Sequence, residues 1–232
     1  MLNRKTKLRI VIYSILILTF CLYKYGRSLW HPIYSKVAGK QTVEEVYQKY
    51  GIQAEKRLAP HFEKANVPYP PSKITLIGLK EESFLEVWAS NKLIKTYPFT
   101  AFSGKLGPKL KQGDRQIPEG IYDIELLHPN SSYHLSLKVS YPNEFDQEIA
   151  PQEGRVNLGG DIFIHGKSVT IGCIPIGDEA IEDLFTLVYK VGKENVELII
   201  APFDFRLYPD RSIKSDLPWL ESKYNRIKKA MN

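Results

Sequence analysis

Short segments rich in apolar residues, with the period of β-strands, run through the chain between residues 72 and 201. They constrain the fold more than any other feature. Each segment is bounded by Gly, Pro, Asn or charged residues, which is typical of β-strands joined by tight turns. Strands of this length and density predict a mainly β domain of the α+β class, built as a β-sandwich or a curled sheet. The predicted strands are Ile74–Leu79, Phe84–Ala89, Leu93–Thr100, Ile121–Leu127, Tyr133–Ser140, Asp161–His165, Ser168–Ile171 and Val196–Ala201.

A helical lead-in precedes the strands over residues 42–71. Thr42 is followed three residues later by Glu45, which is a capping-box signature, and apolar residues then recur at helical spacing. We expect two helical pieces that meet near Gly51, the second of them interrupted or kinked at Pro60.

One strong helix interrupts the strands at Asp178–Lys190. Acidic residues fill its first turns, apolar residues form a single stripe, and Gly192 follows as a stop signal. We expect this one helix to pack across the sheet.

The first 25 residues have the order of an export signal, with basic residues followed by an apolar run. Residues 10–23 contain no charged residue. The run is short for a bilayer span of about 20 residues, but no small-residue cleavage motif follows it. We therefore expect residues 1–25 to form an uncleaved, single-pass membrane anchor that leaves the rest of the chain outside the cytoplasm. Secretion after signal cleavage is the alternative.

The rest of the chain divides by composition. A linker is expected over residues 26–41, the main folded domain over residues 72–207 and a polar, mobile tail over residues 208–232. The formal net charge of +6 is explained by the basic residues of the anchor and the tail, so nucleic acid is not predicted as a partner.

The chain has two cysteines, and Cys21 lies in the apolar run, so Cys173 is a free thiol in an exported domain. His165 ends one predicted strand and Cys173 follows the next, so antiparallel pairing would bring imidazole and thiol together. An adjacent imidazole makes a thiol a competent nucleophile. A buried inert thiol beside a strand-end histidine is equally compatible with this spacing. A zinc site lacks ligands, and no cofactor or metal is predicted.

The backbone before the thiol adds a second feature. Gly172 allows close approach of a substrate, and the amides of Gly172 and Cys173 could face the oxygen that becomes negative in a tetrahedral intermediate.

Several separated blocks resemble a known family, the L,D-transpeptidase (YkuD-type) catalytic domain, and in particular its YafK-like branch. The resemblance spans roughly residues 50–207. The blocks are Gly113-Asp114-Arg115-Gln116-Ile117-Pro118-Glu119-Gly120-Ile121-Tyr122, Tyr141-Pro142-Asn143, Asp161-Ile162-Phe163-Ile164-His165-Gly166, Thr170-Ile171-Gly172-Cys173-Ile174 and Ala201-Pro202-Phe203-Asp204-Phe205.

This resemblance implies that Cys173 is the acyl-accepting nucleophile, His165 the general base and the Gly172–Cys173 backbone the oxyanion hole, with Thr170 orienting the site. The thiolate would attack the carbonyl of meso-diaminopimelate in a peptidoglycan stem peptide, release D-alanine and leave a thioester. An amine of another stem peptide would then give a cross-link, and a lysine of an outer-membrane lipoprotein would give a tether.

Two other functions stay open. The same thioester chemistry could cleave a peptidoglycan–lipoprotein or stem-peptide bond by hydrolysis. A non-catalytic peptidoglycan-binding module is the third reading, since Ile171 and Pro175 stand where many members of the family have polar residues.

Three further residues are candidates for orienting groups or substrate contacts. Gly166 follows the catalytic histidine. His134 alternates with apolar neighbours and faces either the cleft or the surface. Arg115, like Lys109–Lys111, is either a turn charge or a partner for carboxylates of the stem peptide.

Overall fold

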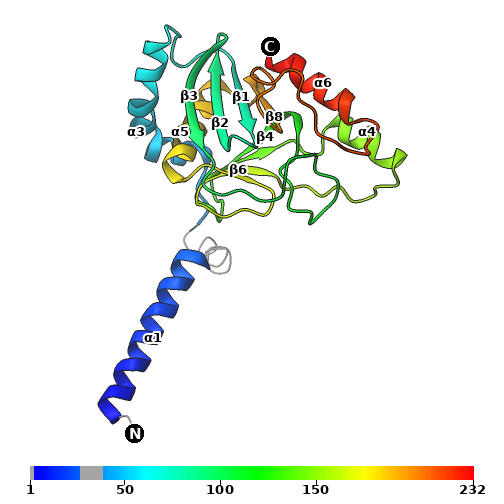
Figure 1. The fold of residues 1–232 in the computed structure, drawn as a ribbon. Helices are drawn as coiled ribbons and strands as arrows, with labels where there is room; N and C mark the ends of the chain where they lie inside the picture. The colour runs from blue at the N-terminus through cyan, green and yellow to red at the C-terminus, as the bar shows by residue number, and fades with distance from the viewer. Residues whose placement is uncertain (1–2, 27–38) are drawn as a thin grey trace. The chain divides into compact units, whose positions relative to one another are not determined.

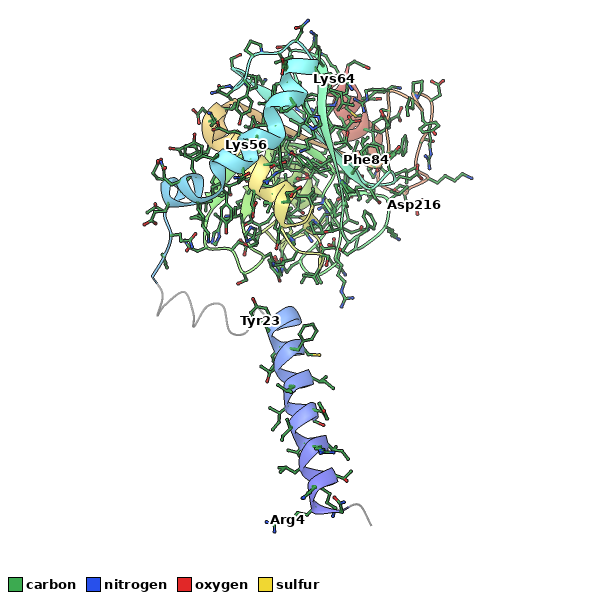
Figure 2. The ribbon with its side chains drawn as sticks, turned by 90° about the vertical axis from the view of Figure 1, so that its left-hand side faces the viewer. Arg4, Tyr23, Lys56, Lys64, Phe84 and Asp216 are labelled. Atoms are coloured by element: carbon green, nitrogen blue, oxygen red, sulfur yellow. The ribbon has the colours of Figure 1, made fainter. Side chains whose placement is uncertain are left out.

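The computed structural model describes residues 3–26 and 39–232, which belong to two compact units, Met1–Gln41 and Thr42–Asn232. Most of the expected linker, residues 27–38, lies outside the described residues. The first unit contains helix α1 (Arg4–Tyr25), whose N-cap Asn3 accepts a hydrogen bond from the Thr6 amide. Its apolar side chains point outward on all sides (Figure 2). Residues 4–23 form one helix of the described chain that is long and apolar enough to cross a membrane, by length and composition.

The second unit is organised around one mixed sheet of eight strands in the order β3-β2-β1-β8-β4-β5-β6-β7 (Figure 1). β1 pairs in parallel with β8, and β6 with β7, whereas the other neighbours are antiparallel. The predicted fold class, mainly β with a curled sheet, is confirmed. The strands are β1 (Ile74–Leu79), β2 (Phe84–Ala89), β3 (Lys92–Pro98), β4 (Gly120–His128), β5 (Ser136–Val139), β6 (Phe163–His165), β7 (Ile174–Pro175) and β8 (Val196–Ala201).

Helices α3 (Val43–Lys64) and α5 (Asp178–Val191) pack together beside the sheet. The capping box at the start of α3 is present as predicted, with Thr42 as N-cap. The expected division of this region into two pieces is wrong, because α3 runs unbroken through Gly51 and Pro60. Its buried face packs on α5, and this packing holds the helix together despite both residues. The prediction that α5 packs against the sheet is confirmed.

Helices α4 (Glu144–Gln152) and α6 (Leu220–Met231) were not expected from the sequence. Asn143 and Asp146 form a capping box that starts α4. The expected polar, mobile tail is wrong for α6, whose residues Leu220, Tyr224, Ile227 and Met231 are buried against β4 and β8. Basic residues dominate the composition of this segment and hide an apolar stripe at helical spacing.

A buried ion pair joins the residue after β1 to the segment before β4, and a hydrogen bond attaches α6 to this pair. Lys80 Nζ lies 2.7 Å from Glu119 Oε1, and both side chains have no exposed surface. Lys80 also donates to the carbonyl of Gly107, and the Tyr224 hydroxyl donates to Glu119 Oε2 at 2.7 Å. Every strong polar group of this cluster therefore has a partner, as a buried pair requires.

Candidate active site

The candidate nucleophile and base lie on neighbouring strands at the end of the sheet. Ile164 of β6 is paired with Ile174 of β7, so Cys173 directly precedes β7 while His165 directly follows the paired position on β6. Side chains alternate along a strand, and positions on either side of a matched pair point to the same face. The register thus places thiol and imidazole on one side of this ladder.

The expected strand Ser168–Ile171 and its antiparallel pairing are wrong. Residues 166–173 form an irregular connection without strand geometry, and β7 runs parallel to β6. A parallel partner cannot follow a tight hairpin turn, so the eight-residue connection loops back before the chain re-enters the sheet. The juxtaposition of His165 and Cys173 therefore comes from a crossover, not from a hairpin.

His165 is buried, with 1% of its surface exposed. Its Nδ1 lies 2.5 Å from the Gly166 carbonyl oxygen, and a carbonyl can only accept, so Nδ1 carries the proton and donates. The neutral ring then has its lone pair on Nε2, which is the form that a general base needs. Burial lowers the pKa of His165, and the bond to Gly166 offsets part of this. The Tyr133 ring packs on the imidazole, with 4.7 Å between ring centroids.

The close packing around Gly166 requires the absence of a side chain. A Cβ at Gly166 would lie 2.6 Å from Asp178 Oδ1 and 2.7 Å from the Tyr133 carbonyl oxygen. Both distances are below van der Waals contact, so a larger residue would displace the backbone that holds the carbonyl partner of His165.

The Cys173 thiol is half-buried, and its Sγ donates weakly to the Asp161 carbonyl at 3.7 Å. Burial raises the pKa of this thiol, and the Phe163 amide offsets only part of the effect. Since the pKa of His165 is lowered, both shifts favour the uncharged forms. Burial therefore favours a neutral thiol and a neutral imidazole at this site.

Thr170 organises the nucleophile turn, residues 170–173, which carries the candidate nucleophile Cys173. Its Oγ1 accepts hydrogen bonds from the amides of Gly172, at 3.1 Å, and Cys173, at 2.9 Å, and donates to the Cys173 carbonyl at 2.7 Å. Both amides that the sequence suggested as oxyanion donors are thus bound to this hydroxyl.

The loop before β4 closes on the same turn. Gly172 has a φ of 131°, which side chains rarely adopt, and a Cβ there would lie 3.1 Å from the Gln116 carbonyl oxygen. The backbone of Arg115 is the next neighbour, with its carbonyl carbon at 3.7 Å from the same point. The backbone of Arg115 therefore lies beside the nucleophile turn, and its suggested role as a partner for substrate carboxylates stays a prediction.

His134 makes its contacts with the helices. Its Nε2 lies 2.8 Å from Glu182 Oε1 of α5, and its ring packs edge-on against Tyr50 of α3. Both of these contacts of the His134 ring are made with helices, and neither involves Cys173.

Sequence reasoning missed two residues of this region, Tyr133 and Asp178. Asp178 bonds to the amide and the ammonium of Lys167, directly after Gly166. A signal for Tyr133 existed, since this aromatic residue directly precedes the candidate His134, but nothing in the sequence linked it to His165. In the residues that the structure describes, no group of three or more His, Cys, Asp or Glu could hold a metal ion.

A thiol and a neutral imidazole on one side of a short parallel strand pair define a candidate cysteine acyl-transfer site in a mixed sheet. A family model described as YkuD, L,D-transpeptidase catalytic domain, matches residues 72–198, which is more than half of the chain. The chain belongs to this family.

Individual relatives agree with this assignment. The chain is 32% identical over 133 residues to the Escherichia coli (strain K12) protein named "Putative L,D-transpeptidase YafK", covering 53% of this chain and 52% of that protein. It therefore spans about half the length of the curated relatives that it matches.

Part of the chain also matches solved structures. One is the helical cell shape determining protein Pgp2 from Campylobacter jejuni, with 22% identity, a TM-score of 0.46 and coverage of 57% of this chain and 48% of that chain. Another is L,D-transpeptidase 1 from Mycobacterium tuberculosis, with 12% identity, a TM-score of 0.32 and coverage of 56% and 62%.

Proposed function

We propose that this domain is a peptidoglycan L,D-transpeptidase that works through a thioester on Cys173 with His165 as general base. The observation that supports this most is the bond from His165 Nδ1 to the Gly166 carbonyl. It leaves Nε2 as the proton acceptor on the side of the ladder that Cys173 shares. Membership of the L,D-transpeptidase family supplies the substrate class, the stem peptides of peptidoglycan.

Acylation starts from the neutral pair. As Cys173 Sγ attacks the carbonyl carbon of meso-diaminopimelate, its proton moves to His165 Nε2. The tetrahedral intermediate collapses when the C–N bond to D-alanine breaks and His165 returns the proton to the leaving amine. A thioester on Cys173 and free D-alanine result.

Transfer of the acyl group reverses these roles. An acceptor amine attacks the thioester carbonyl, gives a proton to His165 and displaces the Cys173 sulfur, which is reprotonated. A side-chain amine of a second stem peptide gives a cross-link, and the lysine of an outer-membrane lipoprotein gives a tether.

The amides of Gly172 and Cys173 are the proposed oxyanion donors, and Gly166 and Thr170 are the orienting residues. Because Thr170 Oγ1 holds both amides, it has to release at least one of them when the substrate oxygen arrives. The hydroxyl thus keeps the donors in place between turnovers.

Hydrolysis is the second candidate outcome. The thiol is only half-buried, and Ile171, two residues before it, is 76% exposed. Water therefore reaches the site and competes with an amine for the same thioester, which would release a cleaved stem peptide or lipoprotein.

Purified protein incubated with peptidoglycan, followed by muropeptide analysis, separates these outcomes. Cross-linked dimers that appear together with free D-alanine support transfer. Loss of lipoprotein-linked muropeptides without dimers supports hydrolysis. A carbapenem adduct mapped to Cys173 by intact mass spectrometry shows an activated thiol, and its absence, together with unchanged muropeptides, would favour a binding module.

We further propose that α1 is an uncleaved anchor in the inner membrane that leaves the second unit in the periplasm. Its length and hydropathy and the basic residues at its start support this topology. Protease added from the periplasmic side should digest the domain, and a mature N-terminus near residue 25–30 would instead show a cleaved signal.

A further inference from the structure

The loop of residues 105–116 is the most basic segment near the candidate active site. It contains Lys105, Lys109, Lys111 and Arg115 and a single acidic residue, Asp114. Its last residues touch the nucleophile turn, since the Gln116 carbonyl oxygen would lie 3.1 Å from a Cβ at Gly172. The backbone of this loop therefore lies beside the turn at which a ligand would reach Cys173.

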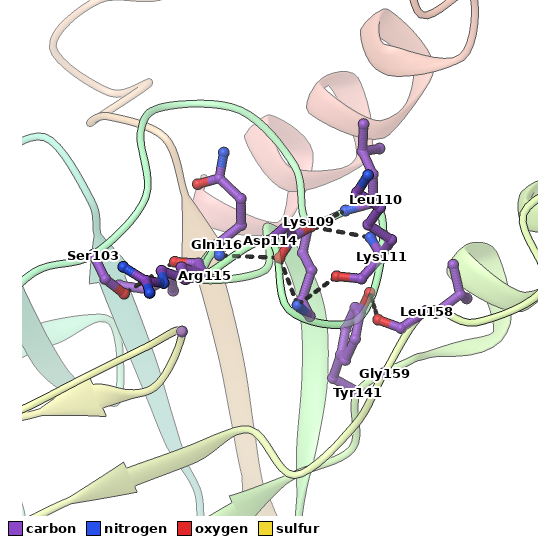
Figure 3. Close-up of polar contacts among 12 residues, drawn as sticks. Ser103, Lys109, Leu110, Lys111, Asp114, Arg115, Gln116, Tyr141, Leu158 and Gly159 are labelled. Carbon is purple, nitrogen blue, oxygen red and sulfur yellow. Dashed lines mark hydrogen bonds and ion pairs between the residues drawn. The ribbon is translucent and has the colours of Figure 1, made fainter.

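The one carboxylate of this loop is used internally. Asp114 Oδ1 accepts from Lys109 Nζ at 2.6 Å and from the Gln116 amide at 3.0 Å, and Oδ2 accepts from the amides of Leu110 and Lys111 (Figure 3). The Lys109 side chain is 5% exposed and also donates to the Lys111 carbonyl. Asp114 and Lys109 thus close the loop as a neutral pair, and neither is available to a ligand.

Arg115 differs from Lys109 in its exposure and in its hydrogen bonding. It is exposed, and within residues 3–26 and 39–232 its guanidinium takes part in no hydrogen bond or ion pair. Its backbone is held in the left-handed region, with a φ of 58°. That conformation is unfavourable for a side chain of this size, and the loop enforces it.

The peptide unit that follows Arg115 is held at both its carbonyl and its amide. The Ser103 hydroxyl donates to the Arg115 carbonyl at 2.9 Å, and the Gln116 amide is bound by Asp114. The Cα atom of Arg115, from which the side chain starts, therefore has a fixed position relative to Gly172, although the guanidinium itself is free. A fixed backbone position with a free guanidinium suits recognition of a ligand that binds at the neighbouring turn.

We propose that Arg115 is a specificity residue that binds a carboxylate of the substrate beside the scissile carbonyl. This rests on the proposed function, in which the donor is an anionic stem peptide. A guanidinium presents paired N–H donors that match the two oxygens of a carboxylate. The ammonium groups of Lys105 and Lys111 supply general attraction but not this paired geometry.

The test uses two donor peptides that differ only in one group, a free carboxylate on the residue of the scissile carbonyl or the corresponding amide. Wild-type protein should prefer the carboxylate donor. Arg115→Gln should lower kcat/KM for that donor by about 10- to 100-fold, mainly through KM, and leave the amidated donor within about 2-fold. Lys111→Gln, which removes a positive charge from the same loop, is the matched control and should change neither donor by more than about 3-fold.

Two further measurements keep the outcomes separate. The rate at which iodoacetamide, a small neutral reagent, alkylates Cys173 should be equal in wild type and Arg115→Gln, which shows that the nucleophile turn is intact. Equilibrium binding of both peptides to the two proteins tests Arg115 even if no turnover occurs, in which case only the proposed function fails. Equal losses for both donors in Arg115→Gln, or a wild type that does not discriminate between them in turnover or binding, would overturn the proposal.

Discussion

The middle of the sheet and the nucleophile turn differ in how extensively their strands are paired and how their polar groups are bonded. β1 and β8 are paired over six positions, and beside them Lys80 and Glu119 are fully buried with all their strong polar groups satisfied. β6 and β7 are paired at two positions only, and the chain between them is irregular. There the polar atoms are held by single side chains, Thr170 above all.

The two regions therefore have different roles, one in stability and the other in reactivity. The central strands, closed by α6 and the buried ion pair, provide most of the stability. The turn contributes little stability but carries groups whose hydrogen bonds can be exchanged, which is what a reacting site requires. Substitutions in the two regions should accordingly affect different measurements.

The largest expected effect is on reactivity, from Cys173→Ser. A serine hydroxyl is far less acidic and less nucleophilic than a thiol, so turnover should fall below a few per cent of wild type. The midpoint of urea unfolding should stay within error, because the thiol is half-buried and makes one weak contact. Cys173→Ala should behave alike in both measurements. Substantial residual turnover in either variant would remove Cys173 as the nucleophile.

The largest expected effect on stability comes from Lys80→Met. Removing the ammonium leaves the Glu119 carboxylate charged in a site without solvent, which typically costs about 3–5 kcal/mol. Urea unfolding followed by circular dichroism measures this loss. Lys138→Met breaks a partly exposed pair with Glu125 and should leave the midpoint unchanged. Similar midpoints for the two variants would contradict the proposed role of the buried pair.

Thr170→Val should have an intermediate effect, and it should fall on reactivity. The substitution keeps the shape but removes the acceptor of two amides and the donor to the Cys173 carbonyl. A nucleophile displaced by about 1 Å loses on the order of 100-fold in rate, so we expect β-lactam acylation of Cys173 to slow by about 10- to 100-fold. Thr170→Ser should restore it. Equal rates in Thr170→Val and wild type would show that other contacts hold the turn.

The smallest expected effect is that of His134→Gln. Glutamine can still donate to Glu182, so we expect a loss of about 0.5 kcal/mol in stability and less than a 2-fold change in acylation at any pH. A strong, pH-dependent loss of acylation would instead make His134 a member of the catalytic group.

Much of the scaffold was predictable because its signals are local. The capping box at Thr42, the stripe of the helix that follows Gly177 and the short apolar runs of β1, β2 and β8 each lie within a few residues of sequence. The apolar stripe of α6 was hidden by its lysines and arginines, whose aliphatic stems tolerate partial burial, and Lys223 is even paired with Asp146 in the interior.

The residues of the candidate site were predictable from the sequence, but the path of the chain between them was not. The two-residue strand β7 is too short to give a period, so the parallel crossover could not be distinguished from a hairpin. The bonds of His165 to Gly166 and of Asp114 to its loop involve backbone atoms whose placement depends on the folded chain. Sequence alone does not show them.

The most direct test of the central claim is the pH dependence of Cys173 acylation by a β-lactam in wild type and His165→Gln. Burial lowers the pKa of His165, so its neutral form persists to acidic pH, and the wild-type rate should rise along a limb below the ordinary histidine pKa of about 6.5. His165→Gln should react at least about 100-fold more slowly near neutral pH. Its rate should increase only toward the thiol pKa, which burial raises. Coincident profiles for the two proteins would contradict the assignment of His165 as the base.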